Sequence, residues 1–276
     1  MAYIDRAEAM EMIEETASKF KEEVQISINS SKTYRRNTLK TDGFEEVPVV
    51  DKEFQSFSVH PKIEIVPLTS DAAIQVYANQ GLKTALLNFA SFCNPGGSVS
   101  RHKGRVHIAQ EESVCIASTL FKSIGNEKFK EDYEYNIKHT NKGLYEDWAI
   151  YSPNIVFPNY IDKKTYRICD VITCAAPDYR ESKKTKDYLT ERRISEYRNI
   201  VFNRIRFVLD VVAYNNVECP ILGAFGCGVF ENPPMMVASI FKELLETYDY
   251  GFKKVVFAIP QGANLFEFED EFNIIS

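Results

Sequence analysis

The sequence predicts an α/β protein in which helices cover both faces of a parallel or mixed sheet. Apolar segments typical of strands alternate with segments whose apolar residues recur at helical spacing. Continuous apolar runs such as residues 255–259 are typical of strands that are buried on both sides. With 45% hydrophobic residues, the chain of 276 residues can form a large core.

The first element expected is an amphipathic helix over about residues 5–24, with Asp5 as its N-cap. The polar segment from Ser30 to Val47 is predicted to be a loop. After it, strands and helices alternate, which favours sheet strands linked by covering helices. We expect strands at 63–66, 84–89, 148–151, 166–175, 221–225 and 254–259, and helices at 71–79, 112–121, 186–214 and 234–246.

The chain is predicted to form a single domain. It contains no repeat of fixed period and no low-complexity tract, and the charged stretch from Lys183 to Arg193 is expected to be a solvated helix entry. Within the domain we expect an N-terminal helical extension (1–60), an α/β core (61–262) and an acidic tail (263–276).

Charge and cysteine content narrow the function classes. The formal net charge of −6 disfavours a protein that binds nucleic acid over its whole surface. The six cysteines are scattered without a CxxC pair, which favours reduced thiols in a cytoplasm and gives no reason to expect a metal site. No apolar run is long enough to span a bilayer, and the N-terminal residues do not fit a signal peptide. A cytoplasmic location with no membrane partner is therefore expected.

Two loops that follow predicted strands carry candidate chemistry, because ligands of open α/β sheets bind beyond the carboxyl ends of strands. The first loop contains Asn94, Gly96, Gly97 and Ser98, and it leads to Gln110, Glu111 and Glu112 at a helix start. Two carboxylates at one site can split their pKa values so that one holds a proton, which permits acid/base catalysis. Acidic residues are also common at ordinary helix starts, so the pair alone leaves the function open.

The second loop follows the strand at 221–225 and contains Gly226, Cys227, Gly228, Val229 and Phe230. Gly226 and Gly228 can adopt positive φ and present backbone N–H groups to an anion, which predicts a diphosphate site. A tight strand-to-helix turn that binds nothing fits the same pattern. Asn232 before Pro233 is expected to cap the next helix. Cys227 lies in no GxSxG motif, so a nucleophilic role for it is not expected.

Several segments together resemble one enzyme family, and they occur in the order LNFASFCNPGGS, AQEESVCIASTLF, YSPNIVF, DVITCAAPDYR, LGAFGCGVFENPP and VVFAIP. The combination is similar to the microbial-type poly(ADP-ribose) glycohydrolases of the macrodomain superfamily, from about residue 6 to residue 259. This resemblance implies a three-layer α/β/α macrodomain-like fold with a mixed central sheet. It also implies ADP-ribose as ligand and hydrolysis of ribose-ribose bonds in poly(ADP-ribose), mainly from chain ends, without cofactor or metal.

The resemblance also implies residue roles. Glu112 would be the catalytic acid and Glu111 would hold the distal ribose, while Gly226 to Phe230 would wrap the diphosphate and Phe230 would pack on that ribose. The remaining residues of the first loop that are expected to bind substrate are Asn94, Gly96, Gly97, Ser98 and Gln110. The chemistry agrees, since cleavage of a ribosyl bond needs a proton for the leaving oxygen and then an activated water. One carboxyl group, that of Glu112, can supply both in turn.

Two features depart from the family pattern. Ser98 stands where a third consecutive glycine is usual, so the approach of the loop to the phosphates is expected to change. The segment between Ser98 and Gln110 looks longer than usual and contains Arg101, His102, Lys103, Arg105 and His107. Its three Arg and Lys side chains are expected either to contact phosphates of polymeric or nucleic-acid-linked substrate or to be solvated surface. For the two histidines, surface positions are expected.

Three alternatives remain at the level of sequence. The chain could bind ADP-ribose without cleaving it, or it could hydrolyse mono-ADP-ribosylated protein or nucleic acid. An NAD-dependent oxidoreductase is disfavoured, because no GxGxxG motif follows an early strand. Phe89, Phe225 and Phe257 lie in strand patterns and are expected in the core instead of stacking on adenine.

Overall fold

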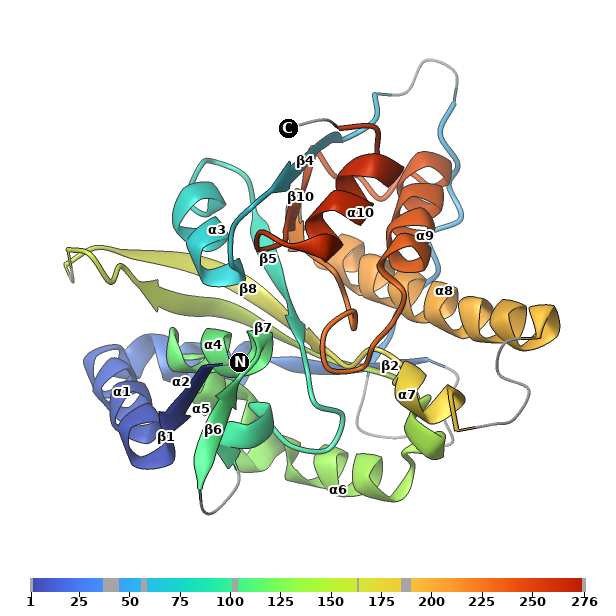
Figure 1. Cartoon of the computed structure of the whole chain (residues 1–276). Coiled ribbons are helices and arrows are strands. Elements are labelled where there is room, and N and C mark those ends of the chain that lie inside the picture. The colour runs from blue at the N-terminus through green and yellow to red at the C-terminus, as the bar shows by residue number, and fades with distance from the viewer. Residues whose placement is uncertain are drawn as a thin grey trace.

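The computed structural model describes residues 2–36, 45–55, 59–100, 104–162, 164–184 and 190–274. In these residues a central eight-stranded sheet lies between two helical layers (Figure 1). The strands are β1 (Ala2–Asp5), β2 (Lys32–Arg36), β3 (Glu45–Glu46), β4 (Lys62–Val66), β5 (Thr84–Phe89), β6 (Arg105–Ile108), β7 (Asp147–Pro158), β8 (Tyr166–Cys174), β9 (Cys219–Leu222) and β10 (Lys254–Ala258). The helices are α1 (Arg6–Lys19), α2 (Lys21–Ser30), α3 (Ser70–Tyr77), α4 (Gln110–Ile116), α5 (Leu120–Ile124), α6 (Lys130–Lys138), α7 (Tyr179–Ser182), α8 (Glu191–Tyr214), α9 (Pro234–Thr247) and α10 (Ala263–Glu271).

The strand order of the main sheet is β3-β2-β7-β8-β5-β9-β10-β4. The five strands from β8 to β4 run parallel, whereas β7 is antiparallel to both β8 and β2. The predicted three-layer α/β/α arrangement with a mixed sheet is therefore confirmed. Because the carboxyl ends of the parallel strands lie at one edge of the sheet, the loops that follow them gather there.

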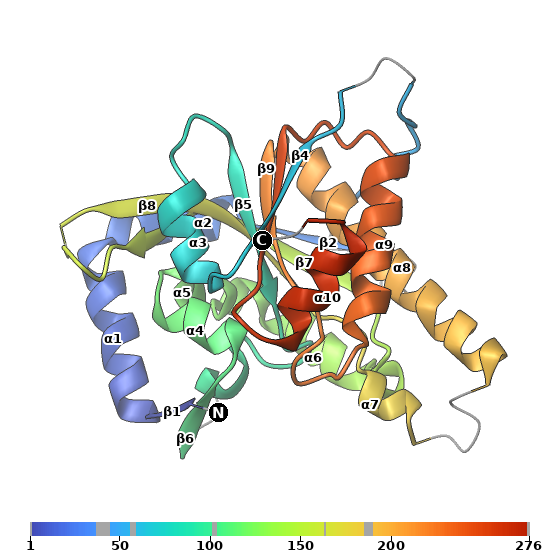
Figure 2. The ribbon, with the colours of Figure 1, turned by 45° about the horizontal axis from the view of Figure 1, so that its top comes forward.

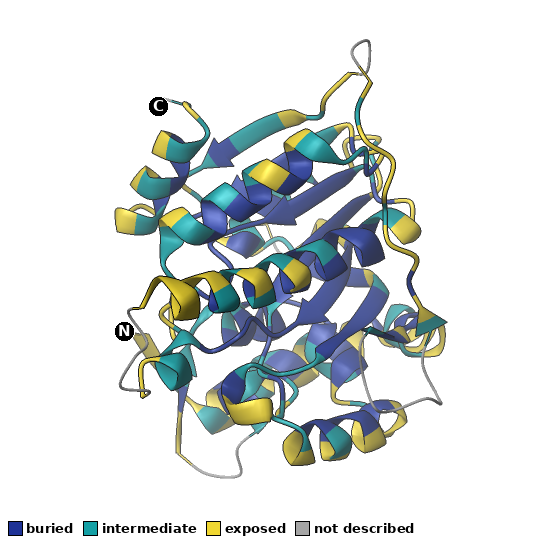
Figure 3. Ribbon diagram, turned by 90° about the vertical axis from the view of Figure 1, so that its right-hand side faces the viewer, coloured by how far each residue is buried: buried dark blue, intermediate teal, exposed yellow. Residues whose placement is uncertain are grey.

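The core has two large parts, one on each face of the sheet, and a smaller cluster formed by residues of α1, α4, β6 and the segment at Val99. Along β5, Ala85 and Leu87 pack into the part formed with α8, α9 and α10, and Leu86 packs into the part formed with α3 to α6. This alternation follows from the two-residue period of a strand. Figure 3 shows the result, with buried strands between helices whose outer surfaces are exposed.

Four predicted elements differ from the structure. The strand expected at 148–151 is the longer β7, Asp147–Pro158. The helix expected at 5–24 is divided at Phe20 into α1 and α2, since Phe20 has non-helical φ and ψ of −120° and 46°. The helix expected at 112–121 is divided into α4 and α5 at Ser118, whose Oγ accepts from the Leu120 N–H. The segment expected to be a loop, 30–47, contains β2 and β3. Its polarity concealed β2, where the fully buried Arg35 is paired with Asp132.

The segments expected as an N-terminal extension (1–60) and an acidic tail (263–276) both contribute buried residues to the core. Tyr34 of β2 is fully buried within the main sheet, and α10 packs against α9 with Phe268 fully buried. These apolar side chains belong to the same core as the central strands. None of the helices in the described residues is long and apolar enough to cross a membrane.

The predicted basic loop between Ser98 and Gln110 is in part a strand. Residues 105–108 form β6, which pairs antiparallel with β1 at the N-terminus, and Figure 2 shows the two side by side close to α4. Arg101, His102 and Lys103 lie outside the described residues. The N-terminal segment is thus attached to the chain that leads into the two glutamates.

Candidate active site

A cleft lies at the carboxyl ends of the parallel strands. Its larger part, about 550 Å³, is bounded by the start of α3 and by the segment that joins β10 to α10. Its smaller part, about 250 Å³, lies against Ala176 and the loop that follows β9. Both parts are lined by Phe89, Ala109, Gln110 and Gly228, so they are adjoining halves of one cleft.

Glu112 lies in the first turn of α4, close to the cleft wall at Ala109. Its Oε1 accepts hydrogen bonds from Ser98 N (2.8 Å) and Ser98 Oγ (2.9 Å), and its Oε2 accepts one from Ala109 N (3.2 Å). The Glu112 side chain is nevertheless buried, with 7% of its residue surface exposed. Its carboxylate is therefore held in one orientation, bonded to Ala109 of the cleft wall, although Glu112 itself lines neither half.

Glu111 is held by the same turn of chain, residues 91–98, which we call the carboxylate turn. Its Oε2 accepts from Ser91 N (2.7 Å), and its Oε1 accepts from Gly96 N (3.1 Å) and Asn88 Nδ2 (3.4 Å). Burial raises the pKa of Glu111 to about 8, the nearby charge of Glu112 adds to this rise, and the hydrogen bonds oppose it. The Glu111 carboxyl group thus holds a proton at neutral pH.

Glycine at position 97 is required by this close approach. Gly97 has φ of +58°, and a Cβ placed there would lie 2.4 Å from Glu112 Oε1 and 3.1 Å from Glu111 Oε2. Both carboxylates therefore face the same point of the backbone. No side chain larger than that of glycine can stand there unless the glutamates move.

The second loop, residues 223–232, which we call the glycine loop, is held in place by contacts with Ala176 and Pro177. Gly226 has the predicted positive φ, +75°, and a Cβ there would lie 2.6 Å from Ala176 Cβ. Gly228 does not use this freedom, since its φ is not positive, and a Cβ there would meet nothing within 4 Å. Asn232 does not cap the next helix; its Nδ2 donates to Pro177 O (2.9 Å) and Gly226 O (3.2 Å). It thereby attaches the loop to the segment after β8.

Comparison with known proteins bears on this site. The family model described as "Microbial-type PARG, catalytic domain" matches residues 4–159, more than half of the chain. The protein belongs to this family. The resemblance inferred from the sequence is thereby confirmed, and with it an enzyme of the glycohydrolase class. No curated protein matches the chain.

Solved structures of PARG enzymes share the fold. The poly(ADP-ribose) glycohydrolase of Thermomonospora curvata has a TM-score of 0.77 and 24% identity, covering 97% of this chain and 98% of its own. Its complex with the inhibitor ADP-HPD has a TM-score of 0.75 and 24% identity, with the same coverage. A single-residue mutant of the Deinococcus radiodurans enzyme, in complex with ADP-ribose, has a TM-score of 0.73 and 25% identity, covering 90% of this chain and 96% of its own.

In this PARG-family chain, the other predicted site residues occupy different positions relative to the cleft. Gln110 lines both halves, yet its amide is engaged within the protein, with Phe89 N as donor to it and Ser70 Oγ and Leu87 O as acceptors. Asn94 is exposed and lines neither half. Val229 and Phe230 line the smaller half.

Cys227 does not have the surroundings of a nucleophile. The Ser98 hydroxyl does not have those of a phosphate ligand. Burial raises the pKa of the Cys227 thiol to about 12, so the thiol is neutral at physiological pH. The Ser98 hydroxyl contacts Glu112 and the backbone of His107. Ser98 has ordinary negative φ, so the serine fits this turn without strain.

Sequence reasoning missed part of the cleft. Phe89, expected in the core, is half-buried and lines both halves, whereas Phe225 and Phe257 are buried as predicted. The segments at the ends of β4 and β10 were also not recognised, and they contribute Thr69, Ser70, Asp71, Ile259, Pro260, Gln261, Gly262, Ala263 and Asn264. Their position directly after strands was the available signal.

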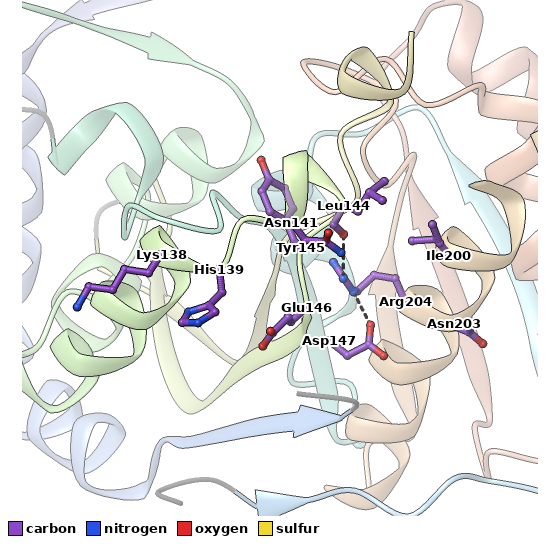
Figure 4. Close-up of a pocket in the computed structure, with 10 residues that line it drawn as sticks. All are labelled: Lys138, His139, Asn141, Leu144, Tyr145, Glu146, Asp147, Ile200, Asn203 and Arg204. Carbon is purple, nitrogen blue, oxygen red and sulfur yellow. Dashed lines mark hydrogen bonds and ion pairs between the residues drawn. The ribbon is translucent and has the colours of Figure 1, made fainter. Parts of the chain in front are cut away.

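A separate cavity of about 500 Å³ lies between the end of α6, the start of β7 and α8 (Figure 4). Its buried Arg204 donates to Asp147 Oδ1 (2.8 Å) and to the carbonyls of Ala175 and Leu144, which attaches α8 to β7. The hydrogen-bonding groups of Arg204 and Asp147 are thus engaged within the protein, and we read this cavity as a place where α8 is attached to the sheet. Within the described residues, no group of three or more His, Cys, Asp or Glu could hold a metal ion.

Proposed function

We propose that the protein hydrolyses the ribose-ribose bonds of poly(ADP-ribose) and releases ADP-ribose, with Glu112 as general acid and then as general base. The observation that carries the proposal is the pair of buried glutamates held beside the cleft by the carboxylate turn. Family membership and the ADP-ribose bound to the D. radiodurans enzyme support the same ligand.

We assign the two halves of the cleft to the two ends of the ligand. The larger half, about 550 Å³ with Phe89 and Asp71 in its wall, has the size and mixed lining that suit a nucleoside. The smaller half, bounded by Gly226, Gly228 and Phe230, suits the diphosphate and the distal ribose. On this assignment the distal ribose lies on the side of the cleft nearest Glu112, whose Oε2 accepts a hydrogen bond from Ala109 of the smaller half.

The two carboxyl groups then have different tasks. Glu111, neutral at physiological pH, can both donate to and accept from ribose hydroxyls. Glu112 gives its proton to the leaving ribosyl oxygen as the bond breaks, and the resulting carboxylate takes a proton from the attacking water. The negative diphosphate bound nearby favours a neutral carboxyl group at the start of this cycle.

The test is the release of ADP-ribose from purified poly(ADP-ribose). Glu112→Gln is expected to lower turnover by about 100-fold or more, because the amide keeps the shape and loses the proton. Its affinity for ADP-ribose, measured by calorimetry, should stay within about tenfold of the parent. Glu134→Gln on the exposed face of α6 is the matched control. Near-normal turnover by Glu112→Gln would overturn the mechanism.

A second substrate class follows from the basic residues before the glutamates. Arg105 on β6 is exposed, with its guanidinium 5.9 Å from the ring centre of Tyr3, and Arg101 and Lys103 lie outside the described residues. Exposed cations next to an active site favour contact with polyanions, here polymeric ADP-ribose or ADP-ribosylated nucleic acid. The same release assay with mono-ADP-ribosylated protein and nucleic acid ranks these substrates.

A further inference from the structure

The hydroxyl of Ser98 has two acceptors for one proton. Ser98 Oγ lies 2.9 Å from Glu112 Oε1 and 3.2 Å from His107 O, and it accepts from His107 N at 3.1 Å. A serine hydroxyl donates once and accepts twice. The hydroxyl proton therefore goes either to the Glu112 carboxyl group or to the His107 carbonyl.

This arrangement matches both states of Glu112. When Glu112 is ionised, the Ser98 hydroxyl donates to it and forms a charge-assisted hydrogen bond. When Glu112 is protonated, the hydroxyl can rotate to donate to His107 O, and its free lone pair can accept the Glu112 proton. Only hydrogens move between the two arrangements, so the heavy atoms at the site stay in place.

We propose that Ser98 is a positioning residue for the reaction: its hydroxyl holds the Glu112 carboxyl group in place and sets the pH above which that group no longer acts as an acid. The inference rests on the proposed function, because it assigns a task to Ser98 through the acid/base role of Glu112.

The backbone that presents the two partners is held from a distant part of the chain. His107 of β6 pairs with Tyr3 of β1, and the two rings are in edge contact at 5.3 Å between centres. Val99, next to Ser98, is fully buried against α1, and its carbonyl accepts from Arg6 Nε at 3.2 Å. Ser98 and His107 are thus fixed relative to each other, which preorganises the hydroxyl between its acceptors.

The titratable and charged groups near Glu112 do not differ between parent and Ser98 variants. On α4 these are Glu111, which burial keeps neutral below about pH 8, and Cys115, which burial keeps as a neutral thiol. The neighbouring elements contribute Arg6 at the start of α1 and Arg105 and His107 on β6. A change in the pH profile of a Ser98 variant therefore reports the lost hydroxyl.

The experiment measures kcat and KM for poly(ADP-ribose) against pH in Ser98→Ala, with Ser98→Thr as the conservative variant. For Ser98→Ala we expect kcat to fall about tenfold with little change in KM, because one charge-assisted hydrogen bond is lost. The alkaline limb of kcat/KM should move up by about one pH unit, equivalent to ~1.4 kcal/mol, since the ionised form loses its donor. Ser98→Thr should restore both.

Ser100→Ala is the matched control, because Ser100 follows the carboxylate turn and its Oγ donates to Gly97 O at 3.1 Å instead of to Glu112. Its profile should coincide with that of the parent. Ser98→Gly tests the same loss without a β-carbon, should the alanine variant fail to fold.

An unshifted alkaline limb in Ser98→Ala or Ser98→Gly would overturn the inference even if kcat falls, because a merely structural defect lowers the rate equally at every pH. The proposed function fails separately, if Glu112→Gln retains activity. An inactive Glu112→Gln together with an unshifted Ser98 profile would reject only the role of Ser98.

Discussion

The carboxylate turn and the glycine loop share local features but differ in what lies beside their glycines. Both follow parallel strands, both are rich in glycine and both lead toward a helix. In the carboxylate turn, the N–H groups of Ser91, Gly96 and Ser98 are occupied by the protein's own glutamates. In the glycine loop, the Cβ direction of Gly228 is open, and Gly228 lines both halves of the cleft.

The difference teaches that a glycine next to an active site can serve either of two partners. At Gly97 the backbone approaches the Glu112 carboxyl group, proposed as the catalytic acid, whereas at Gly228 the space is open, where we propose that the ligand binds. Gly96 and Gly97, predicted to bind substrate, instead face the glutamates: Gly96 N donates to Glu111, and Gly97 leaves room for both carboxyl groups. The following experiments test this division.

The largest effect is expected for Gly97→Ala. The new Cβ would lie 2.4 Å from Glu112 Oε1, and the residue would keep a positive φ of +58°. We expect turnover to fall about 100-fold, because the acid is displaced, and the free energy of unfolding to fall by about 1–3 kcal/mol. Release of ADP-ribose and denaturant unfolding measure the two. Parent-like turnover would show that the glutamates do not depend on this turn.

Gly228→Val should separate binding from folding. Its β-carbon meets nothing within 4 Å and its φ is ordinary, so the free energy of unfolding should change little. The side chain would enter the cleft, and we expect the Kd for ADP-ribose to rise about tenfold or more. Calorimetry on the folded variant measures this. An unchanged Kd would show that the diphosphate binds elsewhere.

Gly226→Val is the informative contrast within the same loop. A Cβ at Gly226 would meet Asn232 Nδ2 and Ala176 Cβ, so both stability and affinity should fall. If Gly226→Val were as stable as Gly228→Val, the packing of Gly226 against Asn232 and Ala176 would not be needed to hold the glycine loop.

Glu111→Gln should change the pH dependence of stability. The pKa of Glu111 is raised from 4.5 to about 8 in the folded protein, so the unfolded chain binds fewer protons between these values. This group therefore lowers the free energy of unfolding as pH rises from about 4.5 to about 8. Glutamine does not titrate, so the free energy of unfolding of the variant should rise relative to that of the parent as pH rises, by on the order of a few kcal/mol. Urea unfolding at several pH values checks it, and parallel curves would contradict a buried neutral Glu111.

The smallest effect is expected for the triple change of Arg101, Lys103 and Arg105 to Ala. Turnover of polymeric or nucleic-acid-linked substrate should fall by about fivefold at low salt and become less dependent on salt, because fewer counterions are released. The Kd for monomeric ADP-ribose should stay the same. Equal activity of variant and parent across a salt series would assign these residues to solvated surface.

Local patterns in the sequence were sufficient to locate most of the central strands and both loops. The strand at 84–89 was predicted with its exact bounds, since a run of apolar residues depends on its own neighbours. Strand β2 was not recognised, because its buried Arg35 reads as a surface residue until Asp132, 97 positions away, is placed beside it. Strand β6 was missed for a similar reason, because its partner β1 (residues 2–5) lies about a hundred positions earlier in the chain.

The sequence by itself determined the fold class, the family and the two loops of the candidate site. Buried strands, glycine turns and adjacent glutamates can be recognised from a few neighbouring residues. Only the tertiary structure decided that burial raises the pKa of Glu111 and that the Ser98 hydroxyl lies within hydrogen-bond distance of Glu112. Proton affinity depends on burial and on donors such as Ser91, 20 positions from Glu111, and the Ser98 contact spans 14 positions. Such distances are set by the packing of whole elements, which no local pattern records.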